Sequence, residues 1–495
     1  MPVAATYQRS ARWTVSWIFV ATAVACVWFA DIRISTLDPW AELGRMFAGL
    51  ITPSLYSQYE FVNALLQTVA FAMLGVALGA LIGFGLALVF HWRIVRTVCA
   101  LLRSIHEIFW ALIFLQIFGL HPLTGLLALG IPYAASFAKI YAEILEEGNP
   151  QALSSIKSNA DSVSTFFYAR LPDLWHHFKT YTSYRLECGL RSSAILGFIG
   201  LPTLGYSLST AFLEGHYSQV WAILISFYLL IASMRYWLRP SLLPFYLLVS
   251  PFIVSNDNSI SVDNVKRFFT QDIVPTPLRT DQPASEFFEW LRMLFSDQAI
   301  PGIFNTLILS QIALVATGVI ALIFFPLISR KFLGPFGRAI GHGILIVLRS
   351  TPEYILAFIF LLLWGPSMLP AIVALALHNG AIIAHLIGRY SNQLPLRQDS
   401  SSGLNIYGYE MLPRVYGQFL VLLFYRWELI FRETAILGIL GIATLGFYID
   451  SAIQDIRLDR ALLLILITGL ANLLIDAASR RIRSGLRLNS TLKFS

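Results

Sequence analysis

Long apolar stretches separated by short polar segments dominate this 495-residue chain. Runs of about 20 apolar residues are long enough to cross a bilayer as helices. The pattern predicts about twelve such helices in two consecutive sets. The first set covers 13–30, 61–90, 98–118, 123–145, 187–213 and 218–236. The second set covers 240–255, 303–328, 341–364, 367–390, 420–446 and 460–478.

The composition also favours an all-α integral membrane protein. Hydrophobic residues make up 57% of the chain and charged residues only 13%, against about 25% in soluble domains. The first stretch follows Arg9 and Arg12 but lacks a clear small-residue cleavage site, so we interpret it as a helix rather than a signal peptide. Cys26, Cys99 and Cys188 have no paired or metal-ligand spacing, so we expect no disulfide framework and no metal site.

The basic residues fall on one predicted side of the membrane. Short loops rich in Lys and Arg face the cytoplasm. Counting twelve spans from a cytoplasmic N-terminus puts the basic clusters on that side and also predicts a cytoplasmic C-terminus. These clusters include Arg93 and Arg96, Arg235 and Arg239, Arg330 and Lys331, and Arg480 to Arg487. The acidic segment 256–300 falls outside. Sidedness therefore explains the net charge of +7 without a nucleic-acid partner.

The second half of the chain repeats the first. Residues 168–209 and 409–450 align without gaps at an offset of 241, with 16 of 42 positions identical. The identities include Arg, Glu, Pro and Gly positions, which shared hydrophobicity alone would not place in register. With six spans in each copy, both copies have the same orientation. We therefore predict two tandem parallel six-helix repeats, residues 1–239 and 240–495, related by a pseudo-two-fold axis along the membrane normal.

Paired ionisable residues lie within the predicted third spans. Arg103 and Glu107 are four residues apart, which predicts neighbours on one helix face, and Arg349 and Glu353 repeat the spacing. Charges at membrane depth usually face the bundle interior or water. The alternative is a salt bridge that reaches the membrane interface. The same two interpretations apply to the matching pair Arg191 and Arg432.

Glycines recur within the apolar sequence of each copy. They permit close helix approach or a local break in a helix, and broken helices commonly line substrate paths. The alternative is tight packing alone. The matching sets are Gly197, Gly200 and Gly205 in the first copy, and Gly438, Gly441 and Gly446 in the second.

A long cytoplasmic segment lies between the fourth and fifth predicted spans of each copy. Residues 146–183 and 391–418 each end in Leu-Pro before the next span. A short amphipathic helix at this place can dock into a groove of a partner protein. The alternative is a helix that lies on the membrane surface.

Several of these motifs together resemble permease subunits of phosphonate-type ABC importers. The resemblance rests on Tyr-Arg-x-Glu-x-x-x-Arg-x-x-Ala-Ile-Leu-Gly-x-x-Gly-x-x-Thr-Leu-Gly in both copies, on Arg-Ser-x-x-Glu, and on Ala-Leu-His-Asn-Gly at 376–380. It covers roughly 60–240 and 300–480. It implies a type I ABC importer permease fold in the bacterial inner membrane, with two permease copies fused in one chain.

The resemblance also implies partners. Such permeases work with two ATPase subunits and an external substrate-binding protein. The chain has no G-x-x-x-x-G-K-[ST] loop, so ATP is expected on the partner subunits and no enzymatic activity or cofactor is expected in this chain. By resemblance the cytoplasmic segments are coupling loops, with contact residues Ser155, Asn159, Val163, Leu171 and Pro172, and Ser400, Gly403, Tyr407, Leu412 and Pro413. The family's coupling loop carries a glycine where Asn159 and Ser400 stand here.

The expected function is import of a phosphonate or related phosphorus oxyanion by alternating access. Arginine suits such a cargo because its guanidinium offers several donors to the oxyanion oxygens. One alternative is an ion-coupled secondary transporter, which twelve helices in two parallel repeats also fit. Another is a membrane enzyme such as a lipid-phosphate transferase, which would need a cluster of acid, base or metal-binding groups at one face.

Overall fold

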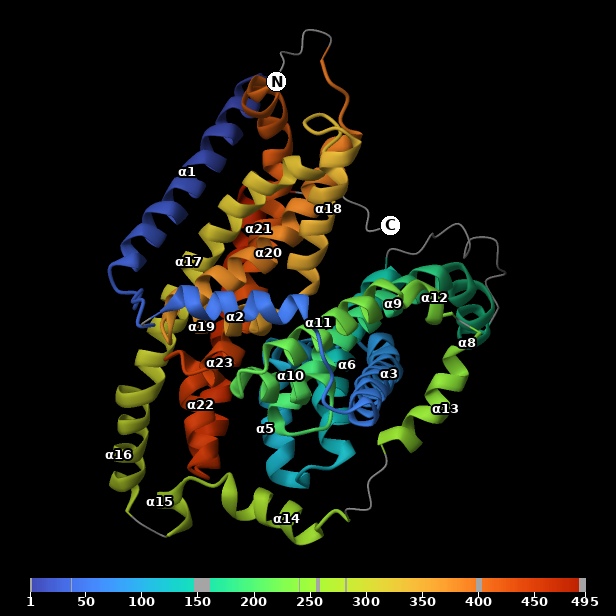
Figure 1. The fold of residues 1–495 in the computed structure, drawn as a ribbon. Helices are drawn as coiled ribbons and strands as arrows, with labels where there is room; N and C mark the ends of the chain where they lie inside the picture. Colours follow the sequence, from blue (N-terminus) through green and yellow to red (C-terminus); the bar gives the residue numbers. More distant parts are fainter. Residues whose placement is uncertain are drawn as a thin grey trace. The chain divides into compact units, whose positions relative to one another are not determined.

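The computed structural model describes residues 2–36, 38–146, 161–239, 241–254, 259–280, 283–397 and 403–488. All regular secondary structure in these ranges is helical (Figure 1). The helices up to residue 272 are α1 Pro2–Val27, α2 Pro39–Ile51, α3 Gln58–Leu88, α4 Arg93–Ser104, α5 Glu107–Phe118, α6 Pro122–Glu146, α8 Ser162–Thr165, η1 Phe166–Arg170, α9 Leu171–Ile195, η2 Leu196–Ile199, α10 Leu204–Leu213, α11 Tyr217–Ala232, α12 Met234–Trp237, α13 Leu243–Val254, α14 Val262–Arg267 and η3 Phe268–Asp272.

The remaining helices lie between residues 276 and 485. They are α15 Thr276–Arg279, α16 Ala284–Leu294, η4 Phe295–Ala299, α17 Ile300–Phe324, η5 Phe325–Ile328, α18 Pro335–Ser350, α19 Glu353–Trp364, α20 Met368–Gln393, η6 Ile406–Met411, α21 Leu412–Ile439, α22 Leu445–Gln454 and α23 Leu458–Gly485. The acidic segment 256–300 contains α14, η3, α15, α16 and η4 where it is described.

Several helices are long and apolar enough to cross a membrane. Among the described residues there are five: Gln58–Leu88, Pro122–Glu146, Ala284–Ile328, Met368–Gln393 and Leu458–Gly485. The number rises to eight if each of three bent helix pairs is one span. The predicted span 420–446 lies on α21, which is not among these helices. The all-helical membrane architecture is thus supported, and the number of twelve spans stays a prediction.

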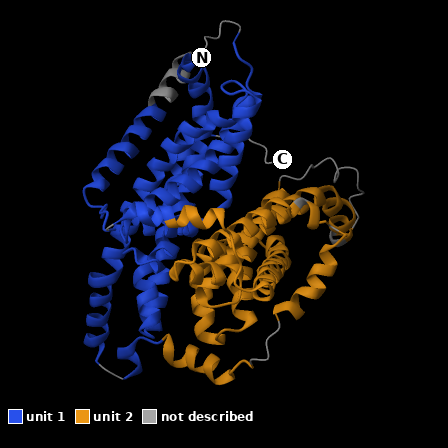
Figure 2. Ribbon diagram, viewed as in Figure 1, with its two compact units in different colours: residues 1–44, 274–495 blue, residues 45–273 orange. Residues whose placement is uncertain are grey.

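The chain forms two compact units (Figure 2). One contains residues 1–44 and 274–495, and the other contains residues 45–273. These limits differ from the predicted repeats, 1–239 and 240–495, because the first segment of each repeat lies in the unit formed by the other repeat. The predicted boundary at 239/240 separates two copies of a duplicated sequence, whereas the compact units reflect contacts in space, so the boundary stays a prediction.

Helix contacts within the units explain this exchange. In one unit α1 packs on α17, and the Gln311 side-chain amide donates to the carbonyl oxygen of Phe19 at 3.0 Å. In the other unit α13 packs on α3, and the Gln67 amide donates to the carbonyl oxygen of Ile253 at 3.1 Å. In both units, a glutamine therefore donates a hydrogen bond to a backbone carbonyl of the first helix of the other repeat.

The tightest helix pair in the unit of residues 45–273 is α3 against α6. Gly75, Gly79 and Gly83 recur every fourth residue along α3, and a Cβ atom on any of them would overlap Leu129, Tyr133 or Phe137 of α6. Small residues at this spacing let two helix backbones approach closely. This close packing fixes the position of α6, which carries Tyr133.

Candidate functional site

The predicted third span of each copy is a bent helix pair rather than one helix. Helices α4 and α5 meet at 91°, and α18 and α19 meet at 94°. Arg103 lies in the last turn of α4 whereas Glu107 begins α5; Arg349 and Glu353 are divided in the same way between α18 and α19. The prediction that each pair shares one helix face is therefore wrong, because the helix is interrupted between the two residues.

The local sequence causes both bends. In the second copy Pro352 follows Thr351, and a residue before proline avoids the helical conformation; Thr351 has ψ 120°. In the first copy Ile105 and His106 are extended, with ψ 133° and 146°. The His106 Nδ1 atom then accepts a hydrogen bond from the backbone N–H of Ile108 at 3.2 Å and caps α5.

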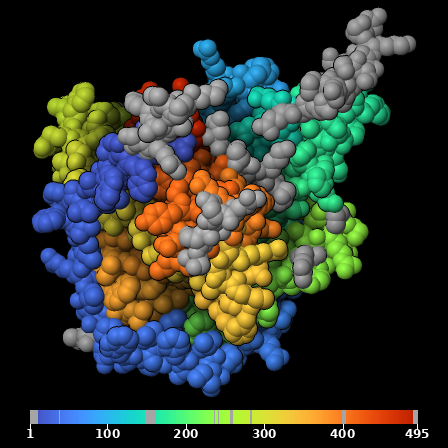
Figure 3. Space-filling model, turned by 90° about the horizontal axis from the view of Figure 1, so that it is seen from above, coloured from blue at the N-terminus to red at the C-terminus, as the bar shows by residue number. Residues whose placement is uncertain are grey.

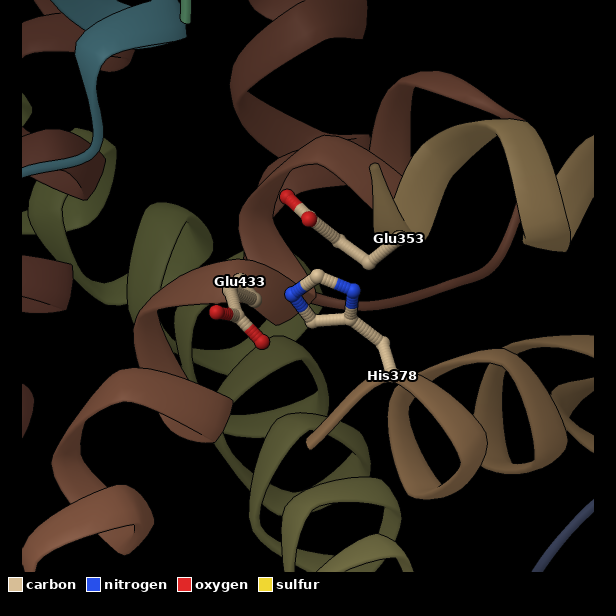
Figure 4. A group of neighbouring side chains, drawn as sticks. All are labelled: Glu353, His378 and Glu433. Carbon is tan, nitrogen blue, oxygen red and sulfur yellow. The ribbon is translucent and has the colours of Figure 1, made fainter. Parts of the chain in front are cut away.

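The bend in the second copy brings Glu353 beside two groups from other helices. Glu353 of α19, His378 of α20 and Glu433 of α21 each offer one ligand atom, and these atoms all lie within 4.8 Å of one another. Figure 4 shows one ring nitrogen of His378 directed toward the Glu433 carboxylate. His378 is 4% exposed and Glu353 9%. Two carboxylates and an imidazole thus converge in a largely buried place.

Hydrogen bonds orient two members of this cluster. The His378 Nδ1 atom lies 2.8 Å from the carbonyl oxygen of Thr351, which can only accept, so Nδ1 carries the proton. The Asn379 side-chain amide donates to Glu433 Oε2 at 2.8 Å. Arg426 Nη1 in turn donates to Asn379 Oδ1 at 3.2 Å. Glu433 therefore belongs to a chain of polar groups that starts at an arginine.

The first copy has a different network at the matching positions. The sequence offsets of 241 and 246 match Asn379 with Tyr133, Glu433 with Ser192 and Arg426 with Arg185. Here the Tyr133 hydroxyl donates to Ser192 Oγ at 3.0 Å, and the Arg185 guanidinium lies 5.6 Å from the centre of the Tyr133 ring. An arginine and a hydrogen-bonded pair stand at the matching positions, but the arginine lies over an aromatic ring instead of donating to an amide, and a hydroxyl replaces the carboxylate. The two copies therefore differ in the charge of this site.

The glycine sets form the same turn in both copies. Gly200 has φ +91° and Gly441 has φ +88°, a conformation that glycine adopts without strain. A Cβ atom on Gly205 would overlap the carbonyl oxygen of Ala194, and one on Gly446 would overlap that of Ala435. The predicted break and the predicted close approach therefore both occur, through different glycines. Gly197 and Gly438 pack on the opposite side of the same contact. A role on a substrate path stays a prediction.

The two remaining arginines of the predicted path lie on long helices. In α9 the Arg191 guanidinium lies 3.5 Å from Glu187 Oε1, one helical turn earlier. Arg432 lies on α21, next to Glu433, and is half-buried. An ion pair within one helix fits the structural interpretation of Arg191.

Part of the first predicted coupling segment is described. Ser155 and Asn159 lie outside the described residues, and only the backbone of Val163 is described. Helix η1 runs directly into α9, which begins with Leu171 and Pro172. Phe166 lies against Phe84 at 6.2 Å between ring centres, and Leu171 packs in the same apolar cluster. Phe167 and Tyr168 are exposed, so the aromatic residues of η1 are divided between two faces.

The second predicted coupling segment repeats this arrangement. Ser400 lies outside the described residues; Gly403 forms a turn with φ +67°, and Leu412 and Pro413 begin α21 after η6. Tyr407 stacks on Phe325 at 5.5 Å between ring centres, and at the matching positions Phe166 contacts Phe84 with tilted rings. Tyr409 is 84% exposed, and the matching Tyr168 is 85% exposed. Figure 3 shows the orange part of the chain, which includes η6, at the surface.

Sequence reasoning missed His378, Asn379 and Glu433 as site residues. His378 and Asn379 belong to the motif at 376–380, but the repeat does not mark them, because the first copy has Pro132 and Tyr133 at these positions. Glu433 follows Arg432. The repeat marks Arg432, which matches Arg191, but it does not mark Glu433, which matches Ser192. The cluster residues Glu353, His378 and Glu433 lie 25 and 55 positions apart along the chain, so no short spacing typical of metal ligands marks them.

The described residues form apolar helices with buried ionisable groups and duplicated Leu-Pro segments, which is consistent with a membrane transport protein. Comparison with known proteins agrees. Over an alignment of 505 residues the chain is 21% identical to the phosphate-import permease protein PhnE of Mycolicibacterium smegmatis, covering 94% of this chain and 93% of that protein. It is 25% identical over 222 residues to the phosphite transport system permease protein PtxC of Stutzerimonas stutzeri, covering 43% of this chain and 81% of the relative.

A third relative is the phosphite transport system permease protein HtxE of Stutzerimonas stutzeri. It is 29% identical over 143 residues, which are 29% of this chain and 55% of HtxE. No family model and no solved structure matches the chain. The relatives confirm the resemblance to phosphonate-type permeases predicted from the sequence, and the long alignment with PhnE fits two fused copies.

Proposed function

We propose that the chain is the membrane-spanning permease of an ATP-driven importer of phosphorus oxyanions such as phosphonate, phosphite or phosphate. The observation that carries the proposal is the alignment with a phosphate-import permease along 94% of this chain. The phosphite-transport relatives each align with less than half of the chain. That is expected if this chain contains two fused copies of their module, in two parallel six-span repeats.

The proposed partners are two ATPase subunits and an external substrate-binding protein, in a bacterial inner membrane with both termini of the chain cytoplasmic. ATP would be hydrolysed on the partner subunits, and the chain itself would not be an enzyme. The duplicated Leu-Pro segments support the two contacts with ATPases. In each of them one aromatic side chain packs inward, Phe166 or Tyr407, while the matching Tyr168 or Tyr409 is almost fully exposed.

The proposed mechanism is alternating access driven by the ATPases. Closure of the ATPase pair would move η1 and η6, and each is continuous with a long helix, α9 or α21. These helices end at the glycine turns of Gly200 and Gly441 and carry Arg191 and Arg432. A movement at the cytoplasmic end can therefore be transmitted along one rigid element to the ionisable groups at membrane depth.

Site-specific crosslinking tests the proposal. Cys26, Cys99 and Cys188 are replaced by serine, and single cysteines are placed at Tyr168, at Tyr409 and at the control position Phe288. Phe288 is 65% exposed on α16, in the segment predicted to lie outside. The variants are purified in mild detergent from membranes of the native host, treated with a bifunctional thiol reagent and examined by mass spectrometry.

We expect Tyr168→Cys and Tyr409→Cys to capture an ATPase subunit and Phe288→Cys to capture none. Transport of radiolabelled phosphate or phosphite in cells should then stop on ATP depletion and persist with a proton uncoupler while ATP is maintained. Transport that stops with the uncoupler alone, with no ATPase captured, would favour the ion-coupled secondary transporter.

A further inference from the structure

The cluster of Glu353, His378 and Glu433 has the chemistry of a metal centre. One imidazole nitrogen and two carboxylate oxygens converge within 4.8 Å from three different helices. Carboxylate oxygen and imidazole nitrogen are ligands that Zn²⁺ and the neighbouring divalent transition metals accept. We propose that these three residues bind one divalent transition-metal ion in the second repeat.

The orientation of His378 supports the proposal. Its Nδ1–H is directed at the carbonyl oxygen of Thr351 at 2.8 Å, which leaves Nε2 as the ligand atom. Metal-binding histidines almost always donate their other N–H in this way, because the hydrogen bond fixes the tautomer and the ring orientation. In Figure 4 the nitrogen on the far side of the ring from the His378 backbone faces the Glu433 carboxylate.

Glu433 accepts a hydrogen bond of the type that orients metal ligands in proteins. The Asn379 amide donates to Glu433 Oε2 at 2.8 Å, and Asn379 is itself fully buried. The other carboxylate oxygen of Glu433 can then face the imidazole. Loss of a hydrogen bond that orients a metal ligand typically weakens metal binding about 10–100-fold.

Burial gives the cluster an energetic reason to hold a cation. Glu353 is 9% exposed and His378 4%. Two carboxylates brought together in a place of low dielectric repel each other, and buried charges are usually paired or coordinate a metal. A divalent cation at the point where the ligand atoms converge would be attracted by both carboxylates at once.

The first repeat cannot form the same site. Pro132 stands at the position of His378 and Ser192 at that of Glu433, so only Glu107 of the three ligands is retained. The proposal therefore predicts one ion per chain rather than two. This stoichiometry separates a built site from general adsorption of metal to surface carboxylates, which would follow the number of exposed acidic groups.

Metal binding by the full-length chain tests the proposal. The protein is purified in lipid nanodiscs, stripped with a chelator, and titrated with Zn²⁺ and with Mn²⁺ by calorimetry; bound metal is counted by mass spectrometry after dialysis. The variants are His378→Gln and Glu433→Gln. The matched control is His385→Gln, which removes another buried histidine of the same helix, two turns away from His378.

We expect about one ion per wild-type chain and per His385→Gln chain, with affinity at least ~100-fold weaker in His378→Gln and Glu433→Gln, the upper end of what a lost orienting group alone costs. Asn379→Ala should weaken binding about 10–100-fold while leaving all three ligands in place. The proposal is overturned if the stripped wild type takes up no ion, if it takes up two or more with equal affinity, or if His378→Gln binds as well as wild type. The wild-type count does not depend on the folding of any variant or on the transport function.

Discussion

At the scale of single residues, one glycine in each copy lies directly against the backbone of the preceding helix. The end of α9 and the start of α10 touch at Gly205, and α21 and α22 touch in the same way at Gly446. A methyl group has no space there, because the neighbouring atom is a main-chain carbonyl oxygen that cannot move aside without disturbing its helix.

Gly205→Ala and Gly446→Ala should therefore destabilise the protein by about 1–3 kcal/mol each, the cost of overpacking a close contact. Thermal unfolding in detergent, followed by size-exclusion chromatography, measures the change. Gly343→Ala is the matched control, because Gly343 lies in α18 with open space around it. Equal melting temperatures for Gly205→Ala and Gly343→Ala would contradict the close contact.

A threonine accepts a hydrogen bond from the helix that follows the glycine turn in both copies. Thr68 Oγ1 accepts a hydrogen bond from the backbone N–H of Leu204 at 2.9 Å, and Thr306 Oγ1 accepts one from Leu445 at 3.0 Å. Each bond satisfies a donor in the first turn of a helix, which has no partner within that helix.

Thr306→Val should cost about 1–3 kcal/mol, because it keeps the shape of the side chain and leaves the buried N–H of Leu445 without an acceptor. Thr317→Val is the control on the same helix: Thr317 is also fully buried, but its Oγ1 makes no hydrogen bond to any part of the chain that the structure describes. Unfolding curves of the two variants compare them directly. If Thr317→Val destabilises the protein as much as Thr306→Val, the hydrogen bond is not the cause.

At the scale of elements, each predicted coupling segment has one aromatic side chain that packs inward and one that is exposed. Phe166 and Tyr407 pack on the aromatic side chains of Phe84 and Phe325, which fixes η1 and η6. Tyr168 and Tyr409 are left exposed. Large exposed aromatic residues at matching places of a duplicated segment are typical anchors for a partner.

Tyr168→Ala and Tyr409→Ala together should lower substrate-stimulated ATPase activity of the assembled transporter at least about 10-fold, if each anchor contributes 1–2 kcal/mol to the contact. The melting temperature should stay unchanged, because neither side chain packs in the core. Tyr59→Ala, which removes an equally exposed tyrosine from the start of α3, serves as the control. Full activity of the double variant would argue against these residues as coupling contacts.

At the scale of the whole molecule, the exchange of first helices joins the two repeats. Helix α1 packs with the second repeat through Trp13 stacked on Tyr416 at 4.8 Å and through the Gln311 bond to Phe19. Helix α13 packs with the first repeat through the Gln67 bond to Ile253. Each repeat therefore lacks, within its own sequence, one of the helices that covers its core.

Residues 1–239 and 240–495, expressed together as separate chains, should associate and purify as one complex, whereas either alone should accumulate poorly. Affinity purification through a tag on one chain, with detection of the other, measures association. Replacing Gln67 and Gln311 by alanine should weaken the complex, because each replacement removes a hydrogen bond between the exchanged helix and its neighbour. If each half accumulates alone as well as in the pair, the exchanged helices are not needed for folding.

The sequence by itself determined the features that depend on local pattern. Apolar runs predicted the helices, the glycines of 197–205 and 438–446 predicted a helix break or a close approach, and residue-by-residue repetition predicted two copies. The family resemblance rested on motifs of fewer than 25 residues and was confirmed by the relatives. Each of these properties is set within a short segment, where neighbours in sequence are neighbours in space.

Only the tertiary structure decided what depends on residues distant in sequence. The right-angle bends separated Arg103 from Glu107 and Arg349 from Glu353, since two extended residues interrupt each helix. The bend at Pro352 then brought Glu353 to His378 and Glu433, and the exchange of α1 and α13 set the limits of the compact units. A hydrophobic pattern records that a helix is covered but not by which helix, so these partners could not be predicted from the sequence of the chain.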